Sequence, residues 1–261
     1  MIRLMIRFFG YPILRRTRFL KDIHKGETCY LVADGISIKN FDFSSFSDHI
    51  SILGGKIPIH RDVTLLKAKY WVNPAPVFWS MPWTATARTM RKLYSSRRAR
   101  NIGAQPIVNF TNILFSRGTK SLYLFDDYSD SRLDDTFISK RVDCFANTAT
   151  MLISVAIYMG FSKAYLIGFD YTHIPSVSHH WYESGSGMLD GNVNYNQEFF
   201  EIAKESIELI SVTPGNESSS LRHVSYKQLT GKDTKFRENK DLLSDSDFDL
   251  LSRLNKYYQI S

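Results

Sequence analysis

Short apolar runs, each closed by a glycine, asparagine, aspartate or proline, recur along this chain of 261 residues and constrain its fold more than any other feature. The first run is CYLVA, residues 29–33, and it ends at Asp34-Gly35. A run that is apolar at every position is typical of a strand buried on both faces of a parallel sheet. Further runs occupy residues 49–53, 70–72, 106–110, 121–125, 163–168 and 209–212. The pattern predicts an α/β fold with a mainly parallel sheet.

The clearest predicted helix covers residues 147–161, where Met151, Val155 and Met159 share one helical face and Gly160 stands at the end. It leads directly into the apolar run 163–168, as in the second half of a βαβ unit. Further helices are predicted over residues 194–207 and 246–258. We therefore expect a Rossmann-like sheet with helices on both faces and a small C-terminal appendage.

Composition divides the chain into three predicted parts. Residues 1–25 form a basic amphipathic N-terminal segment, and residues 26–226 form the Rossmann-like domain. Residues 227–261 form a polar excursion followed by a C-terminal helix, and the stretch 227–245, which is polar and mixed in charge, is expected to be a surface excursion or a flexible linker. Cys29 and Cys144 lie in apolar surroundings and are expected to be buried thiols of a reducing compartment.

The formal net charge is +7, and the basic residues are concentrated near the start of the chain. Basic residues of this segment include Arg3, Arg7, Arg15, Arg16, Arg18, Lys21 and Lys25. They alternate with apolar side chains such as Phe8 and Phe9, which favours a short helix lying on an anionic membrane surface. An N-terminal element packed on the domain explains the same pattern equally well.

No apolar stretch is long enough to span a membrane, so we expect a cytoplasmic protein with peripheral contact to the inner membrane through residues 1–25. A second basic run lies within residues 88–100, but no nucleic-acid-binding module accompanies it, and no specific nucleic acid is expected as a partner.

Candidate binding residues follow the predicted strands, because ligands of parallel sheets bind beyond the carboxyl ends of the strands. Neither a GxGxxG fingerprint nor a GxxxxGK[ST] loop is present, which disfavours classical dinucleotide and P-loop functions. The residues at these predicted strand ends are Asp34, Gly35, Ser37, Gly55, Asn73, Asp170 and Tyr171.

Residues that can transfer a proton follow the run at 163–168. Asp170 is expected to be a carboxylate of the cleft, and His179 or His180 can take a proton from an acceptor hydroxyl near neutral pH. Trp181 is a candidate for stacking on a sugar face, and residues 184–187 (SGSG) suggest a mobile lid.

Three segments carry a resemblance to a known family: LVADGISI (31–38), WVNPAP (71–76) and ATMLISVAIYMGFSKAYLIGFDY (149–171). They resemble bacterial sialyltransferases of glycosyltransferase family 42, and a wider set of proteins related to archaeal 6-hydroxymethylpterin pyrophosphokinase. The resemblance implies a sialyltransferase-like variant of the GT-A fold. It further implies a CMP-activated sugar as donor, a surface glycan as acceptor, and no required cofactor or metal.

The same resemblance implies roles for individual residues. The loop of Asp34, Gly35 and Ser37, together with Asn73, would contact the nucleotide, although the family has an amide where Asp34 stands. Asn147 and Thr148 would bind the donor carboxylate or phosphate at a helix N-terminus. An arginine that the family carries before this helix falls on Phe145, so its role is missing or moves to Arg141. The family histidine aligns with neither His179 nor His180, which are the nearest candidates.

Two other functions remain open from the sequence. The first is an ATP- and Mg²⁺-dependent diphosphotransferase of the pterin kind, with acids such as Asp34, Asp170, Asp126 and Asp127 holding the metal. The second is a non-catalytic glycan- or nucleotide-binding protein of polysaccharide assembly.

Overall fold

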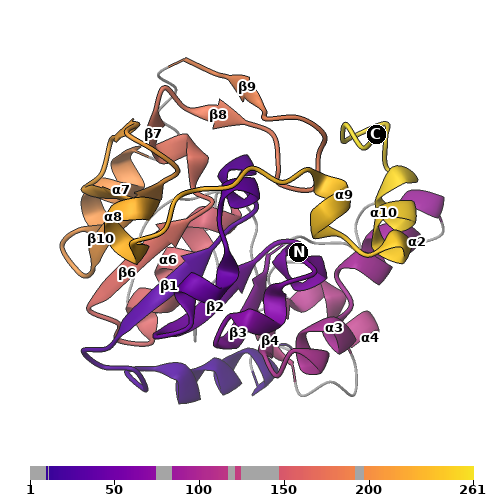
Figure 1. The fold of residues 1–261 in the computed structure, drawn as a ribbon. Helices are drawn as coiled ribbons and strands as arrows, with labels where there is room; N and C mark the ends of the chain where they lie inside the picture. The colour runs from indigo at the N-terminus through magenta and orange to yellow at the C-terminus, as the bar shows by residue number, and fades with distance from the viewer. Residues whose placement is uncertain (1–9, 11, 75–83, 117–120, 125–146, 192–196) are drawn as a thin grey trace.

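A parallel sheet of eight strands forms the centre of the protein, in the order β12-β10-β6-β1-β2-β3-β4-β5 (Figure 1). The computed structural model describes residues 10, 12–74, 84–116, 121–124, 147–191 and 197–261. The strands are β1 (Thr28–Val32), β2 (Ile50–Gly54), β3 (Ala68–Asn73), β4 (Gln105–Asn109), β5 (Leu122–Leu124), β6 (Lys163–Ile167), β10 (Glu208–Thr213) and β12 (His223–Ser225). Every pairing among them is parallel, so the predicted α/β fold is confirmed.

Both faces of the sheet are covered, which explains why successive residues of β1, from Cys29 to Val32, are all buried and mostly apolar instead of alternating with polar ones. In β1, Cys29 and Leu31 pack into one core cluster, and Tyr30 and Val32 pack into the cluster on the other face. Helices α6 (Thr148–Tyr158) and α7 (Gln197–Ala203) supply side chains to the first cluster. The second cluster receives them from α2 (Ala85–Leu93), α3 (Ser96–Asn101), α8 (Tyr226–Thr230), α9 (Asn239–Leu242) and α10 (Asp245–Ser252).

The order of the strands reverses between β1 and β6. From β1 the chain adds β2, β3, β4 and β5 on one side, and it then returns to place β6, β10 and β12 on the other. Because the connections leave in opposite directions there, a crevice opens beyond the carboxyl ends of these two strands. The turns that follow β1 and β6 therefore meet at the place where an open α/β sheet binds its ligand.

Residues 227–245, expected to be a surface excursion or a flexible linker, run over the surface, with residues 231–236 exposed, but they are tied to the domain. The segment contains most of α8 and all of α9, and it buries Asn239 and Leu242. Arg237 anchors it further, because its Nη1 lies 2.5 Å from Oδ2 of Asp62. The final helix α10 is shorter than predicted, and its neighbourhood buries Leu251 and Leu254 in the second core cluster.

Several short elements had no predicted counterpart. They are the helices α2, α3, α4 (Ile113–Ser116), α8 and α9, the edge strand β12, and the small strands β7 (His173–Ile174), β8 (Val177–Ser178), β9 (Met188–Leu189) and β11 (Ser218–Ser219). Strand β8 pairs antiparallel with β9, and Figure 1 shows this hairpin projecting beyond the main sheet.

The described part of the N-terminal segment packs on the domain. Its 3-10 helix η1 (Arg15–Leu20) contributes Leu20 to the first core cluster, whereas Phe19 is 80 % exposed and Ile23 is 44 % exposed. No helix within the described ranges combines the length and hydropathy that a membrane span requires. Predictions that lie outside the described residues concern Arg3, Arg7, Phe8, Phe9, Ala75, Phe125, Asp126, Asp127, Arg141, Cys144 and Phe145. Cys29 is fully buried, as expected.

Candidate functional site

A cavity of about 430 Å³ lies beyond the carboxyl ends of β1 and β6. It brings together turns that are more than 130 residues apart in the sequence. The predicted residues that line it are Asp34, Gly35, Asn147, Thr148, Asp170, Tyr171, His179 and His180. Ser37, Gly55 and Asn73 do not line it, although Ser37 and Gly55 contact residues that do. Asn73 is buried at the end of β3.

Asp170 joins the turn after β6 to the turn after β1. Its Oδ2 accepts the backbone N–H of Ser37 at 2.8 Å, and its Oδ1 accepts the hydroxyl of the same serine. Gly35 permits this approach, because a Cβ there would lie 2.4 Å from the carbonyl oxygen of Gly168 and 2.6 Å from Oδ2 of Asp170. The Asp170 carboxylate is therefore part of the cavity wall with a Ser37 donor on each oxygen.

Asp34 is likewise held by hydrogen bonds, one from the residue that follows Gly55 after β2 and one from the loop that carries Trp181. The backbone N–H of Lys56 lies 2.9 Å from its Oδ2, and Nε1 of Trp181 donates to its Oδ1 at 3.1 Å. Gly55 leaves room for the carboxylate, because its φ is +49° and a Cβ would lie 1.8 Å from Oδ2 of Asp34. The interpretation of Trp181 as a sugar-stacking surface is wrong, since the side chain is fully buried in the core.

The start of helix α6 forms another wall of the cavity through Asn147, Thr148 and Ala149. Asn147 is the N-cap, and its side-chain oxygen accepts the backbone N–H of Thr150 at 3.1 Å. Backbone N–H groups in the first turn of a helix have no intrahelical acceptor, and the helix dipole places partial positive charge there. This wall is therefore suited to a phosphate or carboxylate group.

His180 lines the same cavity and is paired with the carboxylate of Glu183, which does not line it. Nδ1 of His180 is 2.6 Å from Oε1 of Glu183, and the backbone N–H of His180 donates to the same oxygen at 2.9 Å. Burial alone would raise the pKa of Glu183, but the hydrogen bonds from His180 and from the backbone N–H of Gln259 outweigh it and lower the pKa to about 2. A buried, ionised Glu183 favours the His180 tautomer that carries its proton on Nδ1, which leaves Nε2 as an acceptor.

Glu183 was missed at the sequence level, although its spacing of three residues from His180 was a usable signal. His180 itself is 40 % exposed along its side chain. His179 also lines the cavity, with a φ of +78°, and makes no side-chain hydrogen bond within the described part of the chain. The geometry thus separates the two neighbouring histidines: His180 has an orienting partner and His179 does not.

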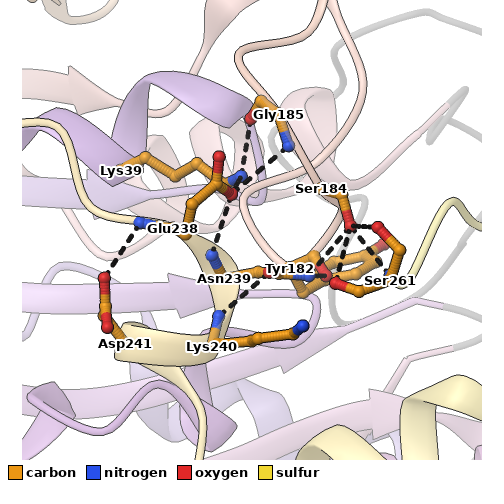
Figure 2. A network of polar contacts seen from close by, with 9 residues as sticks. All are labelled: Lys39, Tyr182, Ser184, Gly185, Glu238, Asn239, Lys240, Asp241 and Ser261. Atoms are coloured by element: carbon orange, nitrogen blue, oxygen red, sulfur yellow. Dashed lines mark hydrogen bonds and ion pairs between the residues drawn. The ribbon is translucent and has the colours of Figure 1, made fainter.

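The loop after Glu183 is tied down, contrary to the mobile lid expected for residues 184–187. Nζ of the buried Lys39 donates to the carbonyl oxygen of Gly185 at 2.6 Å and to Oε2 of Glu238 at 3.0 Å (Figure 2). Nδ2 of Asn239 donates to the carbonyl oxygen of Tyr182 at 3.1 Å. These contacts place the segment after α8 against the loop that carries the histidine–carboxylate pair.

No three acidic, histidine or cysteine side chains group closely enough to hold a metal ion within the described ranges. Asp34 and Asp170, the acids required by the diphosphotransferase alternative, both accept hydrogen bonds from protein donors. The cavity therefore combines the first residues of helix α6 and His180 with two carboxylates, Asp34 and Asp170, each of which is held by protein donors.

Comparisons with known proteins give structural similarity alone. No protein-family model and no curated protein matches the chain. Among solved structures, the sialyltransferase CstII from Campylobacter jejuni in complex with CMP-3FNeuAc is 13 % identical, with a TM-score of 0.49 over 88 % of this chain and 99 % of that one. An α-2,3-sialyltransferase from Campylobacter jejuni in apo form is 10 % identical, with a TM-score of 0.45 over 88 % and 94 %. Because these values are low, the site itself has to support any function.

Proposed function

We propose that this protein is a glycosyltransferase that moves a sialic-acid-like sugar from a CMP-activated donor to a hydroxyl of a glycan acceptor. The observation that carries the proposal is one cavity lined both by the start of α6 and by His180 paired with Glu183. The first feature suits the anionic groups of the donor, and the second suits removal of a proton from the acceptor. The motif resemblance to glycosyltransferase family 42 supports the choice of CMP as the nucleotide.

In the proposed reaction, Nε2 of His180 takes the proton of the acceptor hydroxyl as its oxygen attacks the anomeric carbon. The bond from that carbon to the phosphate oxygen breaks, and CMP leaves with the electron pair, which inverts the configuration. The N–H groups at Thr148 and Ala149 stabilise the negative charge on the donor, and Glu183 stabilises the imidazolium. No metal or other cofactor enters this scheme.

The remaining predicted residues support the binding of the nucleotide. Asp34 and Gly35 line the cavity, where the donor would bind. Ser37 supports this turn by binding Asp170, and Gly55 supports it by leaving room for the Asp34 carboxylate. Tyr171 is 43 % exposed at the cavity and is placed to contact the sugar or the acceptor. Asp170 acts mainly by fixing the wall of the cavity, whereas Asn73, buried at the end of β3, is given no role in this scheme.

The proposal is tested by incubating the protein with a panel of CMP-sugars and glycan acceptors and measuring CMP release and transfer. We expect release with a CMP-activated acidic sugar and its loss in His180→Ala, with the exposed-histidine variant His223→Ala as control. Thermal stabilisation by ATP and Mg²⁺ but not by CMP would instead support the diphosphotransferase. Binding of CMP without turnover of any donor would support the non-catalytic function.

We also propose that the surface of residues 12–25 contacts an anionic lipid bilayer from the cytoplasmic side. Phe19 and Ile23 are exposed there beside the exposed side chains of Arg15, Arg16 and Lys21. Apolar side chains among basic ones are typical of interfacial binding. Sedimentation with vesicles is expected to require anionic lipid and to weaken in Phe19→Ser/Ile23→Ser; equal binding to neutral vesicles would contradict the proposal.

A further inference from the structure

Lys56 is a buried lysine whose charge has no carboxylate partner in the described part of the chain. It follows β2, and the residue is only 2 % exposed. Its Nζ donates to the hydroxyl of Tyr182 at 2.8 Å and to that of Tyr258 at 3.2 Å. Nζ also lies 4.3 Å from the ring centroid of Tyr182, 4.4 Å from that of Tyr258 and 5.4 Å from that of Tyr94. Three aromatic faces and two hydroxyls therefore compensate a charge whose burial is costly.

The two tyrosines that bind Lys56 are also the ones that hold the ring of His180. Tyr182 stacks on the imidazole, with centroids 4.9 Å apart and an interplanar angle of 13°. Tyr258 meets the imidazole edge to face at 5.7 Å and 89°. Lys56 is therefore linked to His180 through Tyr182 on one side and through Tyr258 on another.

The residue after Tyr258 holds the other member of the pair. The backbone N–H of Gln259 donates to Oε2 of Glu183 at 3.0 Å, and its carbonyl oxygen accepts the backbone N–H of Ser184 at 2.7 Å. Displacing Tyr258 would therefore disturb Glu183 as well as His180. A single buried ammonium group connects β2, the histidine loop and the segment around residue 258.

We propose that Lys56 is a positioning residue for His180. By anchoring the hydroxyls of Tyr182 and Tyr258, it fixes the plane of the imidazole so that Nδ1 meets Glu183 and Nε2 remains the nitrogen offered to a ligand. This inference deepens the proposed transfer reaction and rests on it for its functional meaning. Its structural content, the orientation and protonation behaviour of His180, can be measured without any turnover.

The test uses the full chain with Lys56→Met, which keeps the length of the side chain and removes its charge and donors. Lys56→Gln restores a donor, and Lys69→Met is the matched control, because Lys69 lies over the ring of Tyr70 at an exposed position of β3. The ¹⁵N and ¹³C resonances of His180 are recorded over a pH titration. We expect them to change in Lys56→Met, to return partly in Lys56→Gln, and to stay as in the wild type in Lys69→Met.

Kinetics with the active CMP-sugar provide the second measurement. We expect kcat to fall about 10- to 100-fold in Lys56→Met while the dissociation constant of CMP stays within about threefold, the pattern of a lost transition-state interaction. In the His180→Ala background the same substitution should cause no further loss, because residues that act as a unit are not additive.

Unchanged His180 resonances in folded Lys56→Met would overturn the inference, and so would an equal loss of kcat in the His180→Ala background. If Lys56→Met does not fold, Tyr258→Phe applies the same test by removing one hydroxyl acceptor at a half-buried position. A wild-type protein that transfers no sugar would refute the proposed function alone, since the resonances still decide whether Lys56 positions His180.

Discussion

Oε1 of Glu183 accepts both the ring Nδ1–H and the backbone N–H of His180, at 2.6 Å and 2.9 Å. One carboxylate oxygen therefore sets the rotation of the imidazole and the position of its main chain. His179 has no such partner within the described residues, and it occupies the left-handed region of backbone conformation. This difference leads to the first two predictions.

Glu183→Gln removes the negative charge beside the imidazole while keeping the shape of the side chain. We expect kcat for sugar transfer to fall about 10- to 100-fold, because the imidazolium loses its counter-charge and the tautomer is no longer enforced. Steady-state kinetics of CMP release measure the change. The control is Glu201→Gln, which alters an exposed ion pair between Glu201 on α7 and Lys204 just after it, and which should leave kcat unchanged. Full activity of Glu183→Gln would show that the pair has no part in the reaction.

His180→Asn and His179→Asn separate the two histidines. Asparagine tolerates the φ of +78° at residue 179, so His179→Asn is not expected to disturb the fold. Thermal unfolding checks that His180→Asn, which loses the ring contacts with Tyr182 and Tyr258, is folded. We expect kcat to fall by about two to four orders of magnitude in His180→Asn, the usual contribution of a general base, and by less than about fivefold in His179→Asn. The reverse order of effects would assign the base to His179.

Asp170→Asn and Ser37→Ala test whether Asp170 is mainly a tie between two turns. Each change removes part of one hydrogen-bonded contact, and we expect each to lower the free energy of unfolding by about 1 to 3 kcal/mol in urea denaturation. Because both act on the same contact, the double variant should lose less than the sum. A variant Asp170→Asn that is inactive but as stable as the wild type would instead give this carboxylate a direct role in catalysis.

Gly55→Ala should be more harmful than Gly103→Ala, although both residues have positive φ. A Cβ at Gly103 meets nothing within 4 Å, so the cost of Gly103→Ala is the strain of the left-handed backbone conformation, about 1 to 2 kcal/mol. At Gly55 the Cβ would collide with Oδ2 of Asp34, and the carboxylate must leave the N–H of Lys56. We expect an additional loss of about 2 kcal/mol in unfolding free energy and weaker CMP binding in calorimetry. Equal effects of the two substitutions would show that Asp34 can move without cost.

The buried His60 is expected to make the free energy of unfolding depend on pH below 6.5. Burial lowers the pKa of His60 to about 3, and its ring stacks on Phe43 and lies tilted against Trp181. Below about pH 6.5 the unfolded chain binds a proton at His60 that the folded protein does not bind. The contribution of the neutral, buried His60 to the free energy of unfolding is therefore complete above pH 6.5 and is lost as the pH falls towards 3.

Below pH 6.5 we therefore expect the free energy of unfolding of His60→Phe to fall with pH less steeply than that of the wild type, by about 1.4 kcal/mol per pH unit. Urea denaturation at pH 7.0, 6.0 and 5.0 measures this slope, and the constant cost of the lost hydrogen bond from the N–H of Asp62 cancels from it. Identical slopes for variant and wild type would mean that His60 is protonated in the folded protein.

The apolar runs predicted the central strands, and residues 147–161 predicted helix α6, because burial on both faces of a sheet or around a helix leaves a local pattern. The wall formed by Asp34, Gly35, Asp170 and Tyr171 was also predictable, since the carboxyl ends of parallel strands share one edge. The structure of the segment 227–245 was not predictable, because its polar side chains pair with residues far away in the sequence, such as Glu238 with Lys39.

The amino-acid sequence by itself determined the fold class, the positions of the buried strands and the turns that surround the cavity, because each depends on the local alternation of apolar and turn-forming residues. Only the tertiary structure decided which of the two histidines binds Glu183. It also decided that Lys56 contacts Tyr182 and Tyr258, the tyrosines that pack on the His180 ring. The contacts of Lys56 with Tyr182 and Tyr258 join three separate parts of the chain. No local pattern encodes such a contact, since its stability arises from burial and hydrogen bonding that exist only after the sheet has assembled.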